Sequence, residues 1–537
     1  MKTLLAPRAN HADRATHQSF GAAAPFALRA LPARHDPRLH TFGWGPRATP
    51  AHDCIHHAIN TQILRQPQAV AVEHERTSIT YAELDRLARR IQTRLLAGGV
   101  RRGDAVGLFM RRGIPLVAGM LAVMRVGAAY VPQDPGLAPL PLLQQVVDSA
   151  ELRIVLTTAE RAGALGTLEG CEVTSIDSLP QEPTAIPADA PCGPGDRCFI
   201  LFTSGTTGVP NGVEVTHGNV CNLLLTAPGD LGMRPGRRVG QVLAIGFDMA
   251  AWETLGCLAH GATLCIRGGD IAACAARVDV LIATPSILAR LRPQDCPHLQ
   301  VVALAGEPCP QPLAEQWART CRLYIGCGPT EVTIVNTLGE YRCGDAAVTI
   351  GRPTPNNTVY MLDEQLRPCA IGEVGEMWAG GDCVSLGYAN NPRLTDERYR
   401  PDPFLGGGRR MFRTRDLGRW TADGSLEHFG RVDDQVKVRG FRVELDSVSA
   451  VLESTPGCLR AATLKLSDTE LVAFVTPAHV DVDAARERVC ARLPYYCVPV
   501  RVMALGELPI TPRGKVDRQV LLELALRELA ACTQVAA

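Results

Sequence analysis

The chain has 537 residues, of which 46% are apolar and 20% charged, and its 55 Lys and Arg balance its 55 Asp and Glu. This length exceeds a single hydrophobic core, so the composition predicts a globular protein of at least two domains. With a net charge of zero, nothing recruits nucleic acid or an anionic membrane, and no apolar run reaches the length of a membrane span.

The 19 cysteines are scattered, with no C-x-x-C pair and no repeated spacing. Buried reduced thiols are favoured over a zinc site or a disulfide framework, which indicates a reducing, cytoplasmic compartment. The first residues lack the apolar core of a secretory signal, and Arg residues outnumber acids between positions 7 and 34. A disordered leader is favoured there over a transit peptide.

Along the chain, residues 1–50 are rich in Ala, Pro, Arg and His and are expected to form a poorly ordered extension. Apolar spacing predicts a helix from Tyr81 to Leu96. Short apolar runs separated by helical stretches predict buried strands at 105–110, 128–131, 154–156, 198–202, 280–283 and 301–305. This alternation predicts an α/β fold, with a large domain (51–432) of parallel β-sheets covered by helices. A composition change after Gly430 predicts a small, mobile α+β C-terminal domain (433–537).

The strand predicted at 198–202 leads into a loop of Ser, Thr and Gly that extends to Gly208. Glycines let the backbone approach a ligand closely, and successive N–H groups in such a turn bind anions. The hydroxyls of Ser204, Thr206 and Thr207 add donors. The loop matches neither the Walker pattern nor G-x-G-x-x-G. It therefore predicts a polyphosphate site of another kind, and a flexible surface loop is the alternative.

Further motifs follow in order from about Cys54 to Arg518 and carry a family resemblance. They are Ile79-Thr-Tyr-Ala-Glu-Leu-Asp85, Val126-Gly-Ala-Ala-Tyr-Val-Pro-Gln-Asp-Pro135, Phe247-Asp-Met-Ala-Ala-Trp-Glu253, Gly328-Pro-Thr-Glu331, Arg413-Thr-Arg-Asp-Leu417, Gly430-Arg-Val-Asp-Asp-Gln-Val-Lys-Val-Arg-Gly440 and Leu508-Pro-Ile-Thr-Pro-Arg-Gly-Lys-Val-Asp-Arg518. The chain resembles the adenylate-forming enzymes, and two of these motifs are similar to adenylation domains of nonribosomal peptide synthetases. The resemblance is to a fungal-type domain, stand-alone or excised from a larger synthetase.

The resemblance implies that ATP and Mg²⁺ activate a carboxylate by attack on the α-phosphorus, with release of pyrophosphate. It implies three catalytic residues: Thr330 at the α-phosphate, Glu331 as the Mg²⁺ ligand and Lys515 at the developing charge. Asp433 is implied as the hinge about which the small domain rotates, moving Lys515 out of the site before thioester formation. The implied ATP-binding residues are Thr203, Ser204, Gly205, Thr206, Thr207, Gly208, Gly328, Thr330, Asp416 and Arg431.

By the same resemblance, the substrate pocket comprises Asp248, Met249, Trp252, Ala283, Ala303, Ala305, Gly326, Ile334, Val335 and Lys515. A buried carboxylate at Asp248 suits an α-ammonium group, which favours an amino acid over an aryl or fatty acid. Small residues and apolar walls favour a bulky apolar or aromatic side chain, such as that of Trp or Phe, with Leu next. A one-residue shift would place Ile282 in the pocket and shrink it.

Four residues depart from the family pattern: Val209, Asn211, Cys327 and Arg415 stand where Lys, Lys, an aromatic residue and Gly are usual. These departures keep open a degenerate, non-catalytic adenylation fold beside the enzyme interpretation. A CoA ligase acting on an aryl or acyl acid is the other alternative.

No Gly-Gly-x-Ser motif for attaching a carrier arm occurs in the sequence, and the His56-His57 pair lacks the Asp-Gly of a condensation motif. We therefore expect a monomer that passes its adenylate to the phosphopantetheine thiol of a carrier protein in trans, to a thiol cofactor, or to a carrier outside this sequence.

Overall fold

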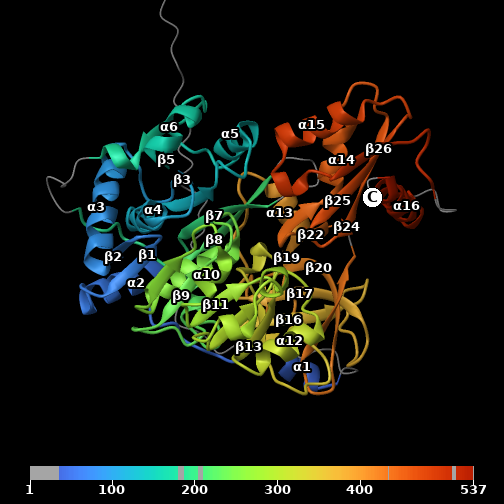
Figure 1. The fold of residues 1–537 in the computed structure, drawn as a ribbon. Coiled ribbons are helices and arrows are strands. Elements are labelled where there is room, and N and C mark those ends of the chain that lie inside the picture. Colours follow the sequence, from blue (N-terminus) through green and yellow to red (C-terminus); the bar gives the residue numbers. More distant parts are fainter. Residues whose placement is uncertain (1–35, 180–186, 204–209, 433–434, 511–515, 536–537) are drawn as a thin grey trace, which may run out of the picture.

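The computed structural model describes residues 36–179, 187–203, 210–432, 435–510 and 516–535. Figure 1 shows a large body that holds most of the chain and a small C-terminal unit on one side of it. Within the described ranges, no helix is long and apolar enough to cross a membrane.

The first sheet has the strand order β18-β8-β7-β4-β3-β5-β6, and β4, β3, β5 and β6 pair in parallel. This confirms the strands predicted between residues 105 and 202, with bounds shifted by at most two residues. The strands are β3 (Ala105–Phe109), β4 (Ala129–Gln133), β5 (Ile154–Thr157), β6 (Glu172–Ser175), β7 (Arg197–Thr203), β8 (Asn211–Thr216) and β18 (Gly387–Tyr388).

The second sheet has the order β15-β14-β13-β12-β11-β9-β10-β1-β2 and is parallel through its centre. The strands predicted at 280–283 and 301–305 are confirmed as its central members. Its strands are β1 (Val70–His74), β2 (Thr77–Thr80), β9 (Arg238–Gln241), β10 (Thr263–Ile266), β11 (Val280–Ala283), β12 (Val301–Leu304), β13 (Arg322–Cys327), β14 (Thr337–Tyr341) and β15 (Arg352–Pro353).

Two helices illustrate how the sequence sets the layers. The helix predicted from Tyr81 is confirmed as α3 (Tyr81–Ala97), which begins at a capping box: the Thr80 hydroxyl accepts from the Glu83 N–H, and the Glu83 carboxylate accepts from the Thr80 N–H. Helix α4 (Ile114–Arg125) is apolar around its circumference and buried from Leu116 onward. It contacts β3 and β4 of the first sheet and β1 of the second, so it lies between the two sheets.

Among the residues that the structure describes, further helices of the large body mostly cover the sheets (Figure 1). They are α2 (Ile55–Arg65), α5 (Leu140–Ser149), α6 (Ala159–Leu165), α7 (His217–Leu224), α8 (Asp248–Ala251), α9 (Cys257–Ala259), α10 (Ile271–Ala275), α11 (Pro285–Leu288), α12 (Gln311–Ala318) and α13 (Pro392–Arg398).

A third sheet, antiparallel, is built from β16 (Asn357–Leu362), β17 (Gly375–Gly381), β19 (Tyr399–Pro401), β20 (Arg410–Trp420) and β21 (Leu426–Arg431). Helix α1 (Arg38–Gly43) packs on it, because Leu39 and Phe42 join Met361 and Trp420 in one apolar cluster. The described part of the expected extension, residues 36–50, is therefore packed against the body. The turn at residues 406–408 consists of three glycines with left-handed backbone and open space around each Cβ position.

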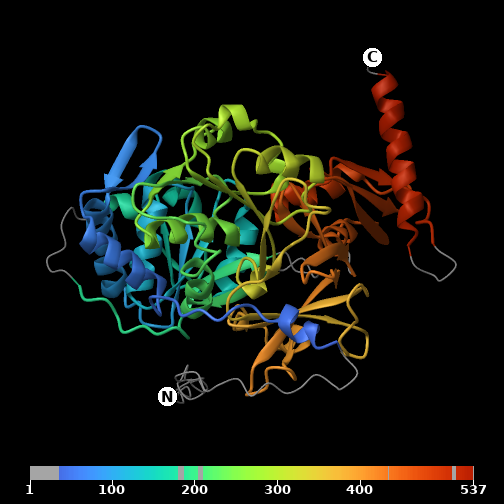
Figure 2. The same ribbon diagram turned by 90° about the horizontal axis from the view of Figure 1, so that it is seen from below.

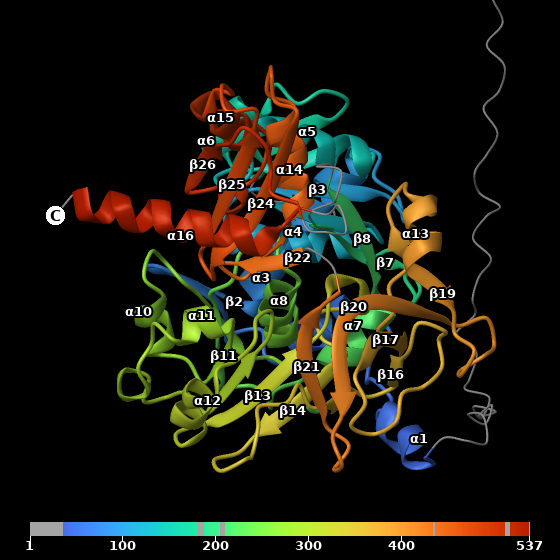
Figure 3. The ribbon, with the colours of Figure 1, turned by 90° about the vertical axis from the view of Figure 1, so that its right-hand side faces the viewer.

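The small unit has its own core and a hairpin that reaches toward the large body. Its elements are β22 (Gln435–Val438), β23 (Phe441–Glu444), α14 (Leu445–Glu453), β24 (Arg460–Ser467), β25 (Glu470–Thr476), α15 (Val482–Arg492), β26 (Arg501–Ala504) and α16 (Arg518–Val535). Helix α16 packs on β24 of the small unit through Leu521 and Ala525, and its C-terminal end projects outward (Figures 2 and 3). This layout agrees with the predicted α/β fold and its smaller C-terminal part. The exact boundary stays a prediction, because residues 433–434 lie outside the described ranges.

Candidate functional site

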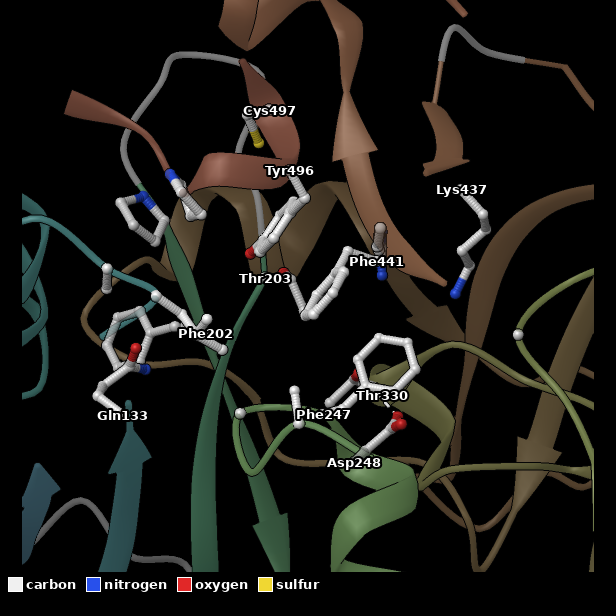
Figure 4. A pocket seen from close by; sticks show the side chains of 18 of the residues that line it. Gln133, Phe202, Thr203, Phe247, Asp248, Thr330, Lys437, Phe441, Tyr496 and Cys497 are labelled. Carbon is white, nitrogen blue, oxygen red and sulfur yellow. Dashed lines mark hydrogen bonds between the residues drawn. The ribbon is translucent and has the colours of Figure 1, made fainter. Parts of the chain in front are cut away.

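A cavity of about 120 Å³ lies where the small unit meets the large body. Figure 4 shows Phe441 and Tyr496 of the small unit above Phe247, Asp248 and Thr330 of the large body. The volume is below the roughly 300–1,000 Å³ of typical small-molecule sites, because the β22–β23 hairpin projects into it.

The turn of this hairpin fits against the large body at a glycine. Arg439 and Gly440 have φ values of 53° and 81°, the left-handed geometry of a tight hairpin turn. A Cβ at Gly440 would lie 2.9 Å from the Thr284 Cγ2, so only glycine allows this approach. Beyond the turn, the Phe441 ring stacks on Tyr496 with centroids 4.0 Å apart.

Glu331, predicted to hold Mg²⁺, is fully buried and bound by the hairpin. Its Oε2 accepts from the Arg442 guanidinium at 2.8 Å, and its Oε1 accepts from the Tyr388 hydroxyl at 2.6 Å. Burial alone would raise the Glu331 pKa, but Arg442, Arg398 and Tyr388 lower it to about 2, so the carboxylate is ionised. A carboxylate suits a hard cation, but Arg442 supplies the positive charge in this arrangement.

Asp248 begins α8, and its carboxylate opens into the cavity (Figure 4). It accepts a 2.8 Å hydrogen bond from the Thr330 hydroxyl. Burial raises its pKa, while Thr330 and the Lys437 ammonium oppose that rise. Lys437 comes from the hairpin, with its Nζ 5.5 Å from the centre of the Phe247 ring. The hairpin thus brings one cation to each buried acid of the site.

A second cluster of polar side chains surrounds Asp416, one of the residues predicted to bind ATP. The Asp416 carboxylate accepts from Arg431 at 2.9 Å, as the pairing of β20 with β21 places them opposite each other. His428 and Cys327 lie within 4.8 Å of the same carboxylate. Burial alone would raise the Asp416 pKa, but His428 and Arg431 lower it, so the group remains an acceptor. Arg415, which stands where the family has Gly, adopts a left-handed backbone with φ 63°.

The predicted pocket residues separate into two sets. Asp248, Met249, Ala305 and Ile334 line the cavity together with Gly328 and Thr330. Buried, and outside that described lining, are Trp252, Ala283, Ala303, Gly326 and Val335. The Trp252 indole N–H donates instead to the Gly229 carbonyl at 2.7 Å.

The backbone around this lining is strained. Thr333 and Ile334 have φ values of 58° and 71°, which is rare for β-branched residues and costs roughly 1–3 kcal/mol each. A Cβ at Gly328 would lie 2.7 Å from the Val335 Cα, which requires glycine at that position.

Several predicted residues lie outside the described ranges: Ser204, Gly205, Thr206, Thr207, Gly208, Asp433 and Lys515. Of the phosphate loop, only Thr203 is described, and it lines the cavity. Val516, which follows Lys515, packs in the cluster of α16 rather than at the cavity. The sequence analysis gave no role to Lys437, Phe441, Arg442 or His428. The Val-Lys-Val-Arg-Gly pattern was the available signal, because an Arg-Gly turn between alternating residues predicts a hairpin.

Glu253, on the π-helical turn Trp252–Gly256 after α8, accepts from the Val242 N–H at 2.8 Å and the Leu243 N–H at 3.3 Å. Burial raises its pKa to about 8. Between about pH 4.5 and 8 the folded state therefore holds a proton that the unfolded state has lost, so stability falls as pH rises. Glu253→Gln keeps an acceptor without the charge and should flatten this fall by up to roughly 1.4 kcal/mol per pH unit. Thermal unfolding midpoints of both proteins from pH 5 to 8 test this, and parallel profiles would contradict it.

The AMP-binding enzyme family matches residues 59–389, more than half of the chain. The chain belongs to this family. Adenylate-forming reductase 06235 of Coprinopsis cinerea is 45% identical over 494 residues, which cover 90% of this chain and 48% of that protein. Nonribosomal peptide synthetase sirP of Leptosphaeria maculans is 35% identical over 492 residues, which cover 91% of this chain and 22% of that protein. This AMP-binding chain thus spans about half the length, or less, of these relatives.

Solved structures agree with the fold. PA1221, an NRPS protein containing adenylation and PCP domains, aligns with a TM-score of 0.80 at 24% identity, covering 88% of this chain and 84% of that one. AB3403, a four-domain nonribosomal peptide synthetase bound to AMP and glycine, aligns with a TM-score of 0.66 at 29% identity, covering 89% and 37%. These comparisons confirm the predicted class, an adenylate-forming enzyme with an adenylation-domain fold. AMP-binding enzymes use ATP, which agrees with the predicted nucleotide.

Proposed function

We propose that this AMP-binding chain activates an α-amino acid with ATP, releases pyrophosphate, and passes the aminoacyl group to the phosphopantetheine thiol of a carrier protein. The observation that carries the proposal is the buried Asp248 carboxylate, which opens into the cavity and lies within electrostatic reach of the Lys437 ammonium. An ionised acid in this position needs a positive partner. When the hairpin leaves, the α-ammonium group of an amino acid supplies one.

The walls of the cavity favour an apolar side chain. Met249, Ala305 and Ile334 contribute apolar surface; the charged residues of the described lining are Asp134, Asp248, Lys437, Arg442 and Glu444. A bulky apolar or aromatic amino acid such as Trp or Phe, with Leu next, suits this lining. Trp252, Ala283, Ala303, Gly326 and Val335 would enlarge the pocket only by a shift of their strands or rotamers, because they are buried in the arrangement described.

The nucleotide would lie between the phosphate loop and the Asp416–Arg431 pair. A fixed carboxylate with two acceptor oxygens suits a vicinal diol, so Asp416 is proposed as the ribose ligand. Mg²⁺ would neutralise phosphate charge and would be held by Glu331 once Arg442 has released that carboxylate. Arg442 and Mg²⁺ are thus alternative partners of the Glu331 carboxylate. We assign the arrangement with the hairpin docked, in which Arg442 is the partner, to the step of thiol transfer.

The direct experiment is a panel of the twenty amino acids in which labelled pyrophosphate exchanges into ATP. Exchange with Trp, Phe or Leu supports the proposal. If calorimetry detects no binding of ATP·Mg²⁺ at millimolar nucleotide, the chain is instead a degenerate, non-catalytic module.

The role of Asp248 is tested by the charge of the substrate. Asp248→Asn keeps an acceptor for the Thr330 hydroxyl but loses the charge that pairs with the ammonium group. Hydrogen bonds to charged groups contribute roughly 1.5–3 kcal/mol, so kcat/KM for the preferred amino acid should fall about 10- to 150-fold. The deaminated analogue of that amino acid should be a poor substrate for both proteins. If the parent chain activates the deaminated acid equally well, the substrate class is wrong.

Two relatives favour a second fate for the adenylate. Adenylate-forming reductases 06235 and 03009 of Coprinopsis cinerea are 45% and 42% identical to this chain and about twice as long as the matched region. A longer protein that contains this domain would then reduce the carrier-bound acyl group. Adding free CoA, a carrier protein, or a carrier followed by a reductase domain to the exchange-competent chain distinguishes a CoA ligase, a peptide synthetase and a reductase.

A further inference from the structure

Away from the cavity, three distant segments bring two cysteines and two histidines together. Cys54 precedes α2, His56 lies in its first turn, Cys192 precedes β7, and His217 begins α7. His56 and His217 are fully buried, as is Cys54. None of the four lines the described cavity.

Their ligand atoms fall into two overlapping groups that share His56. The His56, Cys192 and His217 atoms lie within 4.8 Å of one another, and so do those of Cys54, His56 and His57. The Cys54 and Cys192 thiols are also close neighbours. Ligand atoms around a tetrahedral zinc lie roughly 3.3–3.8 Å apart, since the Zn–N and Zn–S bonds are about 2.0–2.3 Å. His56, Cys192 and His217 already form one group, and a rotation of the Cys54 side chain would have to bring its thiol to the same ion.

The histidine rings give the independent evidence for a ligand. Within the described part of the chain, neither ring nitrogen of His56 or His217 has a hydrogen-bond partner. The two rings instead lie at 60° to each other with centroids 5.1 Å apart. A buried polar group without a partner costs about 1–3 kcal/mol, and buried histidines normally satisfy both nitrogens. A shared cation would use the free lone pair on each ring.

We propose that Cys54, His56, Cys192 and His217 form a tetrahedral site for a divalent cation of the zinc type. Two thiolates and two neutral imidazoles are a common structural zinc ligand set, and the two thiols each release a proton on binding. The sequence did not indicate this site, because its ligands have no short-range spacing and meet only in the folded chain.

The site would hold the base of the phosphate-loop hairpin. Strands β7 and β8 pair in antiparallel register from Arg197↔Thr216 at one end to Thr203↔Asn211 at the loop end. Cys192 lies just before the first strand and His217 directly after the second. A metal bound to both and to α2 ties the start and the end of this hairpin to the helix layer. Its role is therefore structural, distant from the reacting groups.

The test uses the full chain, purified under reducing conditions without a metal-affinity tag, with zinc measured by plasma mass spectrometry. We expect about one zinc per chain. After removal by a chelator, Co²⁺ should give the visible bands of a tetrahedral thiolate complex, and Zn²⁺ should bleach them and raise the thermal unfolding midpoint. Cys54→Ser and Cys192→Ser should each lose the cobalt spectrum. The matched controls Cys274→Ser, buried, and Cys343→Ser, exposed, should keep it.

The cobalt spectrum of the parent chain does not depend on how the variants fold. A parent chain that binds no zinc and gives no tetrahedral cobalt spectrum would overturn the proposal. So would a Cys54–Cys192 disulfide in the protein as purified, or undiminished zinc binding by the Cys54→Ser and Cys192→Ser double variant.

Discussion

Arg442→Met should release the hairpin from the large body. The substitution leaves the buried Glu331 carboxylate with the Tyr388 hydrogen bond and without the guanidinium at 2.8 Å. Removing one partner of a buried ion pair costs about 3–5 kcal/mol, so the docked arrangement should become more than about 100-fold less populated relative to the undocked one. Amide hydrogen exchange over residues 435–444 measures this directly, and exchange there should accelerate.

Two matched variants separate this ion pair from general damage to the hairpin. Arg439→Met removes a neighbouring arginine whose guanidinium donates to the Thr469 carbonyl, and it should leave hairpin exchange near the parent level. Combining Arg442→Met with Glu331→Gln removes both charges and should restore much of the protection. Equal acceleration in the Arg439 and Arg442 variants would contradict the role of the ion pair.

Lys515→Ala should lower formation of the adenylate by roughly 10²–10³-fold, the effect typical of removing a group aimed at developing negative charge. The same variant, given preformed aminoacyl-adenylate, should load a carrier thiol at close to the normal rate. This expectation follows from the described arrangement, in which the hairpin lines the cavity and Val516 packs in the cluster of α16. Single-turnover assays of each half-reaction measure the two effects separately.

Asp433→Pro should give the opposite pattern, because proline restricts the backbone dihedral at the predicted hinge. Adenylate formation should persist while transfer to the thiol slows. Equal loss of both half-reactions in both variants would point to a single fixed site with no rotation of the small unit.

Local patterns predicted much of the fold. A local pattern of apolar residues indicates whether a segment is half-buried or fully buried. The apolar spacing predicted α3 in this way, and short apolar runs predicted β3, β4, β5, β11 and β12. The motifs also predicted that Asp416 and Arg431 belong to one site, and the two residues lie opposite each other on paired strands joined by a short turn. The packed segment 38–43 was missed because only two apolar residues, Leu39 and Phe42, anchor it.

The rest depends on how separate parts of the chain meet. No local pattern says that Lys437 and Arg442 reach the buried acids Asp248 and Glu331, because this depends on the docking of two units. The Cys/His cluster likewise joins three separate segments, at Cys54 with His56, at Cys192 and at His217. The family motifs also predicted only part of the cavity lining. Ala283 and Ala303 lie in buried strands, where the direction of a side chain depends on the register.

The docked hairpin has a thermodynamic consequence for every affinity measured on this chain. If the amino acid and the metal bind as proposed, Arg442, which is paired with Glu331, and Lys437, whose charge acts on Asp248, compete with them for the two carboxylates. The apparent dissociation constant of a ligand therefore equals its intrinsic constant divided by the fraction of molecules whose hairpin is withdrawn. If that fraction were about 1%, binding would look about 100-fold weaker than the contacts themselves allow. Weakening the hairpin can thus tighten substrate binding without touching the pocket.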